Sequence, residues 1–332
     1  MITTSFYRRF LIIQTAFIGD VILATALLEE VRHQFPEAVI DMMVRKGNES
    51  LLANHPHLND VLIWHKKEGK YRSLYRLLRT VRHRQYDAII NLQRFGATGL
   101  LTALSKANVT IGFDKNPFSR FYTHAVPHRI EPGVHEVDRN AALMRPLGNT
   151  PQQTRPKLYP SPTDYEAVRY YQQQSYVCIA PTSVWFTKQY PEEKWVDLIQ
   201  QLPAHHNIYL LGAPNDSAAC ARIAAQANRP NIVNLAGKLS LLQSAALMQG
   251  AAMNYVNDSA PMHMASAMNA PTTAIFCSTV PQFGFGPLAD HSRTVEISEQ
   301  LDCKPCNLHG RKACPLGHFR CAHGIRTEQL LA

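Results

Sequence analysis

The sequence predicts an α/β protein with two successive Rossmann-like domains, whose parallel sheets face a central cleft. Two observations predict this fold class. Short apolar segments alternate with helical patterns through the first half of the chain, and the alternation starts again after a proline-rich stretch at residues 149–163. Such alternation is typical of a parallel sheet that helices cover. The 332 residues are enough for two domains of ordinary size.

The first domain is expected over residues 1–155. It begins with an apolar strand at Phe10–Ile13, a short loop that contains Gly19 and Asp20, and a helix that starts at once after this loop. Four more strands are expected at Val39–Val44, Val61–Trp64, Ala88–Leu92 and Val109–Phe113, with helices near 47–54, 71–84, 96–105 and 135–147.

Residues 149–163 lack periodicity and are expected to form a linker. The second domain is expected over residues 165–332. Its predicted strands are Tyr176–Ala180, Ile208–Leu211, Ile232–Leu235, Met253–Val256 and Thr272–Phe276, with helices near 192–202, 215–227, 240–250 and 260–268.

The composition limits the possible partners and location. The formal net charge of +9 favours an anionic partner, but no RNA-binding aromatic signature or Cys/His finger spacing is present, so we expect no nucleic acid. No apolar run is long and uninterrupted enough for a transmembrane helix, and the first apolar run lacks a signal-peptide cleavage site. We therefore expect a cytoplasmic monomer, peripheral at the inner face of the cytoplasmic membrane.

The loop with Gly19 and Asp20 is the most informative segment of the first half. It follows a strand, and ligands bind at the carboxyl ends of strands in open α/β sheets. Asp20 is therefore either a helix N-cap or a catalytic carboxylate. Its single glycine excludes both the dinucleotide fingerprint and the phosphate-binding P-loop.

Three strand ends of the second half carry polar side chains. Ser183, Thr187 and Lys188 follow the first strand and offer donors to phosphate, while Asp216 begins a helix after the second strand. A helix that starts near Pro261, capped by Asp258 or Ser259, would offer free N–H groups to a diphosphate. Ordinary capping or a solvated loop is the alternative at each position. Three such strand ends that converge on one sheet edge indicate a ligand site more strongly than any one of them alone.

Taken together, these motifs resemble the heptosyltransferases of glycosyltransferase family 9. The resemblance covers nearly the whole chain in the family's order. The segments that carry it are Ile18–Ile22, Tyr86–Gln93, Ile111–Phe113, His135–Arg139, Thr187–Trp195, Gly212–Pro214 and Asp258–His263.

The resemblance implies a GT-B architecture and an inverting transfer of L-glycero-D-manno-heptose from ADP-heptose to the inner core of lipopolysaccharide. It implies that the N-terminal domain binds this anionic, lipid-linked acceptor and the C-terminal domain the donor. Asp20 matches the family's catalytic base. The donor positions are expected to be Ser183, Thr187, Lys188, Asp216, Asp258, Ser259 and His263, and the acceptor positions Gly19, Gln93 and Arg94.

Residues 278–287 resemble most closely the type that adds the second heptose. Asp216 stands where the family often has Glu, and Ala260 stands where Gly is usual. The alternatives are a transferase or epimerase of the same fold that acts on another nucleotide sugar, and a non-enzymatic nucleotide or metal sensor.

No metal or other cofactor is expected, because Lys188 and helix N-termini can hold the diphosphate. Four cysteines near the C-terminus, Cys303, Cys306, Cys314 and Cys321, resemble a zinc site with one C-x-x-C pair. His309, His318 and His323 could substitute as ligands. Free thiols are the favoured interpretation, since a stable disulfide is disfavoured in the cytosol.

A basic segment extends from Lys66 to Arg84 and contains one acid, Glu68. Arg72, Arg76 and Arg79 share a helix face opposite a row of leucines. This face is predicted to meet an anionic surface, such as the inner membrane or the phosphates of the acceptor, rather than being an ordinary solvated face.

Overall fold

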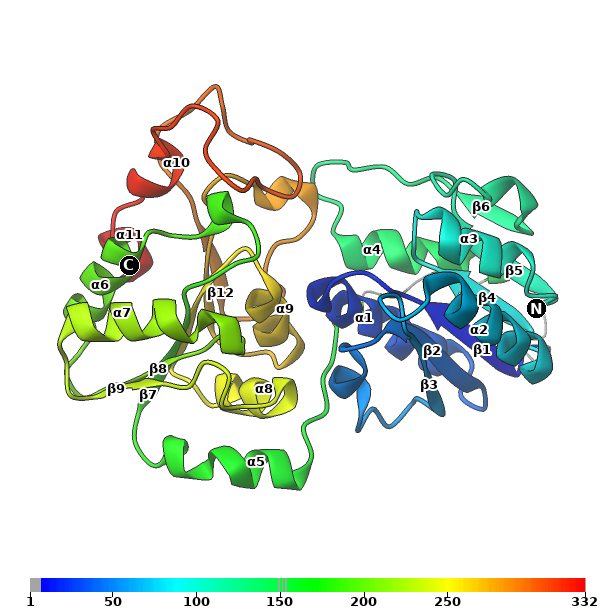
Figure 1. Ribbon diagram of the computed structural model, residues 1–332, viewed down its shortest axis with the longest axis horizontal. Coiled ribbons are helices and arrows are strands. Elements are labelled where there is room, and N and C mark those ends of the chain that lie inside the picture. The colour runs from blue at the N-terminus through cyan, green and yellow to red at the C-terminus, as the bar shows by residue number, and fades with distance from the viewer. Residues whose placement is uncertain (1–6, 149, 151, 153, 332) are drawn as a thin grey trace. The chain divides into compact units, whose positions relative to one another are not determined.

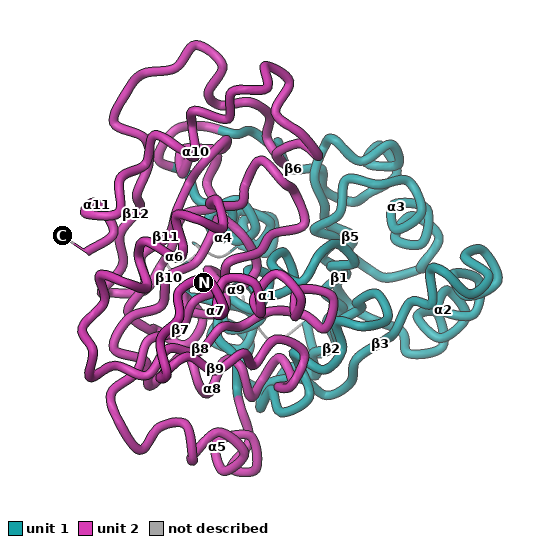
Figure 2. The backbone as a smooth tube through the Cα atoms, turned by 60° about the vertical axis from the view of Figure 1, so that its left-hand side comes forward, with its two compact units in different colours: residues 1–130, 134–159 teal, residues 131–133, 160–332 magenta. Residues whose placement is uncertain are grey.

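The computed structural model describes residues 7–148, 150, 152 and 154–331 (Figure 1). The chain separates into two compact units, coloured differently in Figure 2. Unit 1 consists of Met1–Ile130 and Val134–Tyr159, and unit 2 of Glu131–Gly133 and Pro160–Ala332.

Unit 1 contains a six-stranded, wholly parallel sheet in the order β3-β2-β1-β4-β5-β6. The direction of strand order reverses between β1 and β4, and this switch point is where α/β sheets bind ligands. The strands are nearly continuous apolar runs because helices cover both faces of such sheets. They are β1 (Arg9–Ile13), β2 (Val39–Arg45), β3 (Asp60–Trp64), β4 (Ala88–Asn91), β5 (Val109–Phe113) and β6 (His124–Val126).

Within the described residues of unit 1, α-helices and 3₁₀ turns lie between these strands and after the last of them. Helix α1 begins directly after the β1 loop, and its residues 21–31 are all buried. The helices are α1 (Ile18–Gln34), α2 (Lys70–Arg84), α3 (Gly96–Ala103) and α4 (Glu136–Ala141), with 3₁₀ turns at Glu49–Leu52, Ser119–Phe121 and Ala142–Leu147.

Unit 2 repeats the same topology. Its parallel sheet has the order β12-β11-β10-β7-β8-β9, so the switch point lies between β7 and β10. The strands are β7 (Tyr176–Ala180), β8 (Asn207–Leu210), β9 (Ile232–Asn234), β10 (Met253–Asn257), β11 (Thr272–Ile275) and β12 (Ser292–Val295).

The α-helices of unit 2 are α5 (Pro162–Val168), α6 (Glu192–Gln201), α7 (Ser217–Ala227), α8 (Leu241–Gln249), α9 (Ala260–Ala267), α10 (Arg320–His323) and α11 (Glu328–Leu331). The 3₁₀ turns lie at Arg169–Gln172, Phe186–Lys188, Pro214–Asp216 and Pro281–Phe283.

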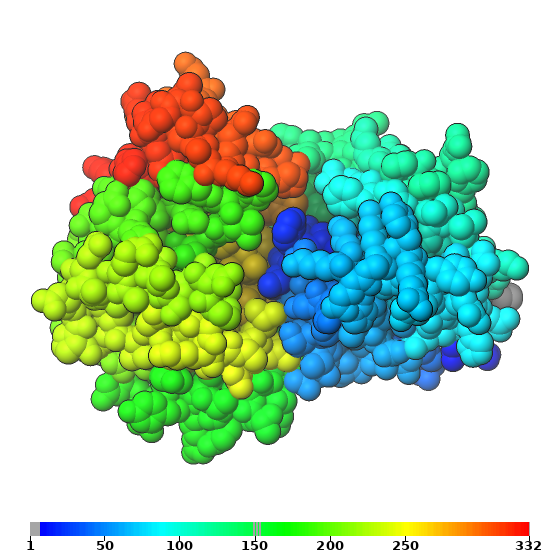
Figure 3. All heavy atoms as spheres, in the orientation of Figure 1, coloured from blue at the N-terminus to red at the C-terminus, as the bar shows by residue number. Residues whose placement is uncertain are grey.

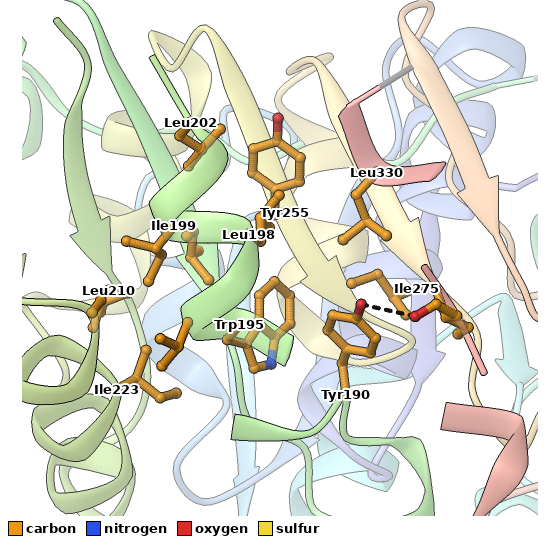
Figure 4. Close-up of a cluster of buried hydrophobic side chains, with 14 of the residues drawn as sticks. Tyr190, Trp195, Leu198, Ile199, Leu202, Leu210, Ile223, Tyr255, Ile275 and Leu330 are labelled. Carbon is orange, nitrogen blue, oxygen red and sulfur yellow. Dashed lines mark hydrogen bonds between the residues drawn. The ribbon is translucent and has the colours of Figure 1, made fainter. Parts of the chain in front are cut away.

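The core of unit 2 joins the sheet, helix α6 and the C-terminal tail (Figure 4). Trp195 of α6 meets the Tyr190 ring edge to face, with 5.3 Å between ring centroids. The Tyr190 hydroxyl donates to the Ile325 carbonyl at 3.2 Å. Ile325 and Leu330 of the tail are fully buried in the same cluster, so the tail is part of this core.

The predicted strands are confirmed to within one residue at each end, while β6 and β12 were not predicted. The helix predicted at 47–54 is wrong in type and length, because only a 3₁₀ turn over Glu49–Leu52 forms. The linker predicted at 149–163 extends too far toward the C-terminus, because its last residues form the start of a helix. Ser161 accepts the Asp164 N–H and caps α5, which therefore begins at Pro162. Residues 149, 151 and 153 of that linker lie outside the described residues.

Candidate active site

In unit 1 the switch point presents Asp20 at the start of α1. Phe17 occupies the N-cap position, and Asp20 is the third residue of the helix. Its Oδ2 accepts the Phe17 N–H at 3.1 Å. Asp20 is thus not the N-cap, but its side chain does satisfy one N–H at the helix start. The positive end of the helix dipole favours the ionised carboxylate there.

A pair of amides spans the switch point between the β1 and β4 ends. The Gln93 side-chain amide donates to the Gln14 Oε1, which also accepts the Ala16 N–H at 3.2 Å. The Gln93 backbone N–H donates to Asn91 Oδ1 at 2.9 Å. Gln93 is therefore a buried part of the loop scaffold, whereas its neighbour Arg94 is exposed.

A charged cluster in unit 1 was not predicted. Arg139 Nε donates to Glu136 Oε2 at 2.8 Å, and both side chains lie on α4. Burial raises the pKa of the Glu136 carboxyl although Arg139 opposes the shift, and the charge of Asp20 raises it further. Burial, together with the charges of Arg94 and Arg139, lowers the pKa of His128 to about 4. These effects place Glu136 and Arg139 in the electrostatic environment of Asp20.

In unit 2 an ion pair spans the switch point between β7 and β10. Lys188 Nζ lies 2.7 Å from Asp258 Oδ2, and the two side chains are only 16% and 6% exposed. Thr279, which follows β11, donates its hydroxyl to the same carboxylate oxygen at 2.6 Å. Asp258 therefore fixes the position of the Lys188 ammonium.

Hydrogen bonds from other segments of unit 2 hold the loop that follows β7. The Asn257 side chain donates to the Pro181 carbonyl at 2.8 Å and accepts the Tyr190 N–H at 2.9 Å. The buried Thr187 hydroxyl accepts from Ser278 and from the Arg311 N–H, at 3.0 and 2.7 Å.

The other predicted donor residues lie on neighbouring strand ends. Ser259 is the N-cap of α9 without a side-chain capping bond, and His263 is buried one turn into that helix. Asp216 Oδ2 accepts the Ala213 N–H at 2.7 Å after β8. Ser183 contributes its carbonyl oxygen, which accepts from Gln189 at 2.7 Å. Unit 2 therefore brings the predicted donor residues to the carboxyl edge of its sheet, with Lys188 and Asp258 in direct contact.

The cysteines at the C-terminus are all free thiols. Cys321 is buried, and burial raises its pKa to about 11. Within the described residues, no group of three or more His, Cys, Asp or Glu side chains is arranged to hold a metal ion. No helix in the described part of the chain is both long and apolar enough to span a membrane.

The model of glycosyltransferase family 9 (heptosyltransferase) matches residues 74–316. Lipopolysaccharide heptosyltransferase 3 of Escherichia coli is 28% identical over 79% of this chain and 82% of its own length. Lipopolysaccharide heptosyltransferase 1 of Pseudomonas aeruginosa is 26% identical over 97% of this chain and 93% of its own length.

Solved structures of the same fold include ADP-heptose lipopolysaccharide heptosyltransferase II of Escherichia coli. It has a TM-score of 0.75 and 21% identity, with 97% of this chain and 98% of that chain covered. A family 9 glycosyl transferase of Veillonella parvula has a TM-score of 0.84 and 20% identity, with 98% and 95% covered. The predicted fold class, α/β of the GT-B type with two parallel-sheet units, is confirmed. The chain belongs to glycosyltransferase family 9 and is a glycosyltransferase.

Proposed function

We propose that this enzyme transfers L-glycero-D-manno-heptose from ADP-heptose to the inner core of lipopolysaccharide, with inversion at the anomeric carbon. The observation that carries the proposal is the Lys188–Asp258 ion pair at the switch point of unit 2. It positions a cation where α/β sheets bind nucleotides. Membership of the heptosyltransferase family supports heptose as the transferred sugar.

Unit 2 is assigned the donor. Lys188 and the N–H groups at the start of α9 would hold the diphosphate and stabilise the negative charge of departing ADP. Thr187 would act through the loop that it anchors, and Ser183 and His263 would line the same site. Asp216 is assigned to the ribose hydroxyls, since an acid after the second strand of such a sheet often has this role.

Unit 1 is assigned the acceptor, with Asp20 as the general base that removes the proton from the attacking hydroxyl. An inverting transfer needs a base on the acceptor face and charge stabilisation on the leaving-group face, by analogy with inverting glycosidases. Gly19 and Gln93 would shape the loops around the base, and the exposed Arg94 would meet an anionic group of the acceptor. Glu136 and Arg139 would tune the charge near Asp20.

The proposal requires no metal, because Lys188 and a helix N-terminus supply the positive charge that a divalent cation would otherwise provide. We propose that the enzyme acts as a monomer on a lipid-linked acceptor at the inner face of the cytoplasmic membrane. Among the heptosyl steps, the proposal favours addition of the second heptose, on the resemblance of residues 278–287.

The test is a mass-spectrometric transfer assay with the purified chain, ADP-heptose and core acceptors that carry no heptose, one heptose or two. The proposal predicts a product heavier by one heptosyl residue with the one-heptose acceptor. A product only with one of the other acceptors would reassign the step, and no product with any of them would overturn the function. The anomeric configuration of the product, measured by NMR, tests inversion.

A further inference from the structure

Helix α2 exposes a face that combines positive charge with aromatic rings. Its outward side chains are Tyr71, Arg72, Tyr75, Arg76, Arg79, Arg82 and His83. With 3.6 residues per turn, these positions cover an arc of roughly 140°. The opposite side packs into the core of unit 1 through Leu74, Leu77 and Val81. Figure 3 shows this segment, in light blue, at the molecular surface.

The central arginines of this face have no acidic partner within the described part of the chain. Arg72, Arg76 and Arg79 form no ion pair with any residue that the structure describes. The nearby Glu68 is engaged by Lys46 at 2.8 Å and by His65 at 3.2 Å. Such a concentration of one sign repels itself unless an anionic partner offsets it.

Arg84 does not belong to this face, although it is part of the same basic segment of the sequence. Its guanidinium forms ion pairs with Asp41 at 2.7 Å and with Asp60, so its charge is neutralised within unit 1. The predicted basic surface is therefore smaller than the sequence pattern indicated, and it is centred on three arginines.

Apolar side chains adjoin the same face. Tyr71 and Tyr75 are 76% and 62% exposed. The Arg82 Nε donates to the Leu104 carbonyl at 2.7 Å, which joins the end of α3 to the outward face of α2. Leu104 and Leu100, one turn apart, are 43% and 39% exposed. Tyrosine rings and leucines beside arginines are typical of surfaces that lie in the interface of a bilayer.

We propose that this face, which we call the α2–α3 face, docks the enzyme on the surface of an anionic lipid bilayer. The arginines would meet lipid phosphates while the two tyrosines and the two leucines enter the headgroup region. A nucleic acid would use the charge but would not need the exposed leucines, so a membrane fits the observations better. The proposal deepens the proposed function, since it names the surface that would bring unit 1 to a lipid-linked acceptor.

The experiment is flotation of the purified chain with vesicles of phosphatidylethanolamine, with and without phosphatidylglycerol. The triple variant Arg72→Gln, Arg76→Gln and Arg79→Gln should bind the anionic vesicles about 100-fold more weakly, at about fivefold per basic residue. A higher salt concentration should weaken vesicle binding by the wild type until it approaches that of the variant, because the Debye length is only about 10 Å at 0.1 M. Tyr71→Ser with Tyr75→Ser should weaken binding at both salt concentrations.

A matched control separates this face from overall charge. Three exposed arginines of unit 2 each pair with a glutamate: Arg169 with Glu166 at 3.3 Å, Arg222 with Glu192 at 2.5 Å, and Arg320 with Glu299. Changing these three to Gln lowers the net charge from +9 to +6, as does the α2 triple variant. The control should float like the wild type if the location of the charge decides binding.

Equal flotation of the α2 triple variant and the wild type would overturn the proposal. If, in addition, the triple variant binds transfer RNA more weakly than the wild type does, the face is a nucleic-acid surface instead. Melting temperatures of all variants exclude unfolding as the cause. Because flotation uses neither ADP-heptose nor an acceptor, its failure is distinguishable from failure of the proposed transfer reaction.

Discussion

The ion pair between Lys188 and Asp258 makes the sharpest prediction for the donor site. Changing Lys188 to Met removes the ammonium but keeps much of the aliphatic side chain. Asp258, which is 6% exposed, then retains the Thr279 hydroxyl but loses the cation that lies 2.7 Å from its carboxylate. The variant should therefore lose both stability and donor affinity.

The stability loss follows from the uncompensated carboxylate. Removing one partner of a buried ion pair costs roughly 3–5 kcal/mol. The Lys188 side chain is 16% exposed and Thr279 still donates, so we expect about 2–3 kcal/mol. For a unit of this size that corresponds to a melting temperature lower by about 5–10 °C.

The affinity loss follows from the missing charge. A hydrogen bond to a charged group contributes about 1.5–3 kcal/mol, so ADP should bind roughly 10- to 150-fold more weakly. The two losses should separate in the double variant Lys188→Met, Asp258→Asn. The asparagine at position 258 is neutral, so the buried charge is gone and about 2 kcal/mol of stability should return. The affinity for ADP should stay low, because position 188 still lacks the cation that contacts the diphosphate.

Chemical denaturation and calorimetry of ADP binding measure the two quantities. Lys194→Gln is the matched control, since it removes a lysine charge from α6 of the same unit without touching the Asp258 pair. Full recovery of ADP affinity in the double variant would refute a direct contact between Lys188 and the donor. An unchanged stability in the single variant would refute the ion pair.

Three further predictions follow from the described geometry. Gly212→Ala would place a Cβ 2.7 Å from the Asp216 Cβ, so the turn that carries Asp216 must shift. Because Asp216 is the proposed ribose contact, calorimetry should show weaker ADP binding. Burial lowers the pKa of His55 to about 4, below its usual 6.5, while Glu29 at 3.4 Å opposes the shift. The free energy of unfolding should therefore be highest above pH 6.5 and fall by up to about 3 kcal/mol as the pH drops toward 4, and His55→Gln should flatten this slope in urea titrations. Dialysis against a chelator should leave the transfer rate unchanged, and a rate restored only by added divalent metal would contradict the metal-free donor site.

The sequence was sufficient to predict most of the sheet. Phe10–Ile13 and Tyr176–Ala180 are buried apolar runs bounded by polar loops, and this pattern identifies central parallel strands well. The edge strands His124–Val126 and Ser292–Val295 were missed because they are short and carry polar residues. Helix α5 was missed because two prolines near its start resembled a linker, although Ser161 caps it.

The sequence places the candidate residues at strand ends, but it does not reveal how their side chains pair. Strand ends were enough to select Asp20, Lys188 and Asp258, since each follows a strand beside the switch point. That Lys188 pairs with Asp258, 70 positions further along the chain, depends on strand order, which the sequence does not reveal. The contact of Thr279 with Asp258 was missed for the same reason, because it joins two separate strand ends. The Glu136–Arg139 pair is local, at positions i and i+3 of α4, and it was not predicted although both residues belong to a segment that carries the family resemblance.

Asp20 is the proposed catalytic base, and its contacts suggest how to isolate that role. The Asp20 Oδ2 accepts the Phe17 N–H at the start of α1. An asparagine keeps an oxygen that can accept this bond but is neither charged nor basic. Asp20→Asn therefore removes the base while preserving the contact at the helix start.

A second aspartate supplies the control. Asp164 occupies the same position in α5, where its Oδ2 accepts the Ser161 N–H at 2.8 Å. Asp164→Asn thus makes the same chemical change at a helix start that has no proposed part in transfer.

The most direct test is the turnover of Asp20→Asn with ADP-heptose and the core acceptor, measured alongside the affinity for ADP-heptose. If Asp20 is the base, Asp20→Asn should lower turnover by about 10²–10⁴-fold with little change in donor affinity, and Asp164→Asn should have near-normal turnover. Near-normal turnover of Asp20→Asn would contradict a catalytic role for Asp20 and leave its contact with the Phe17 N–H as its function.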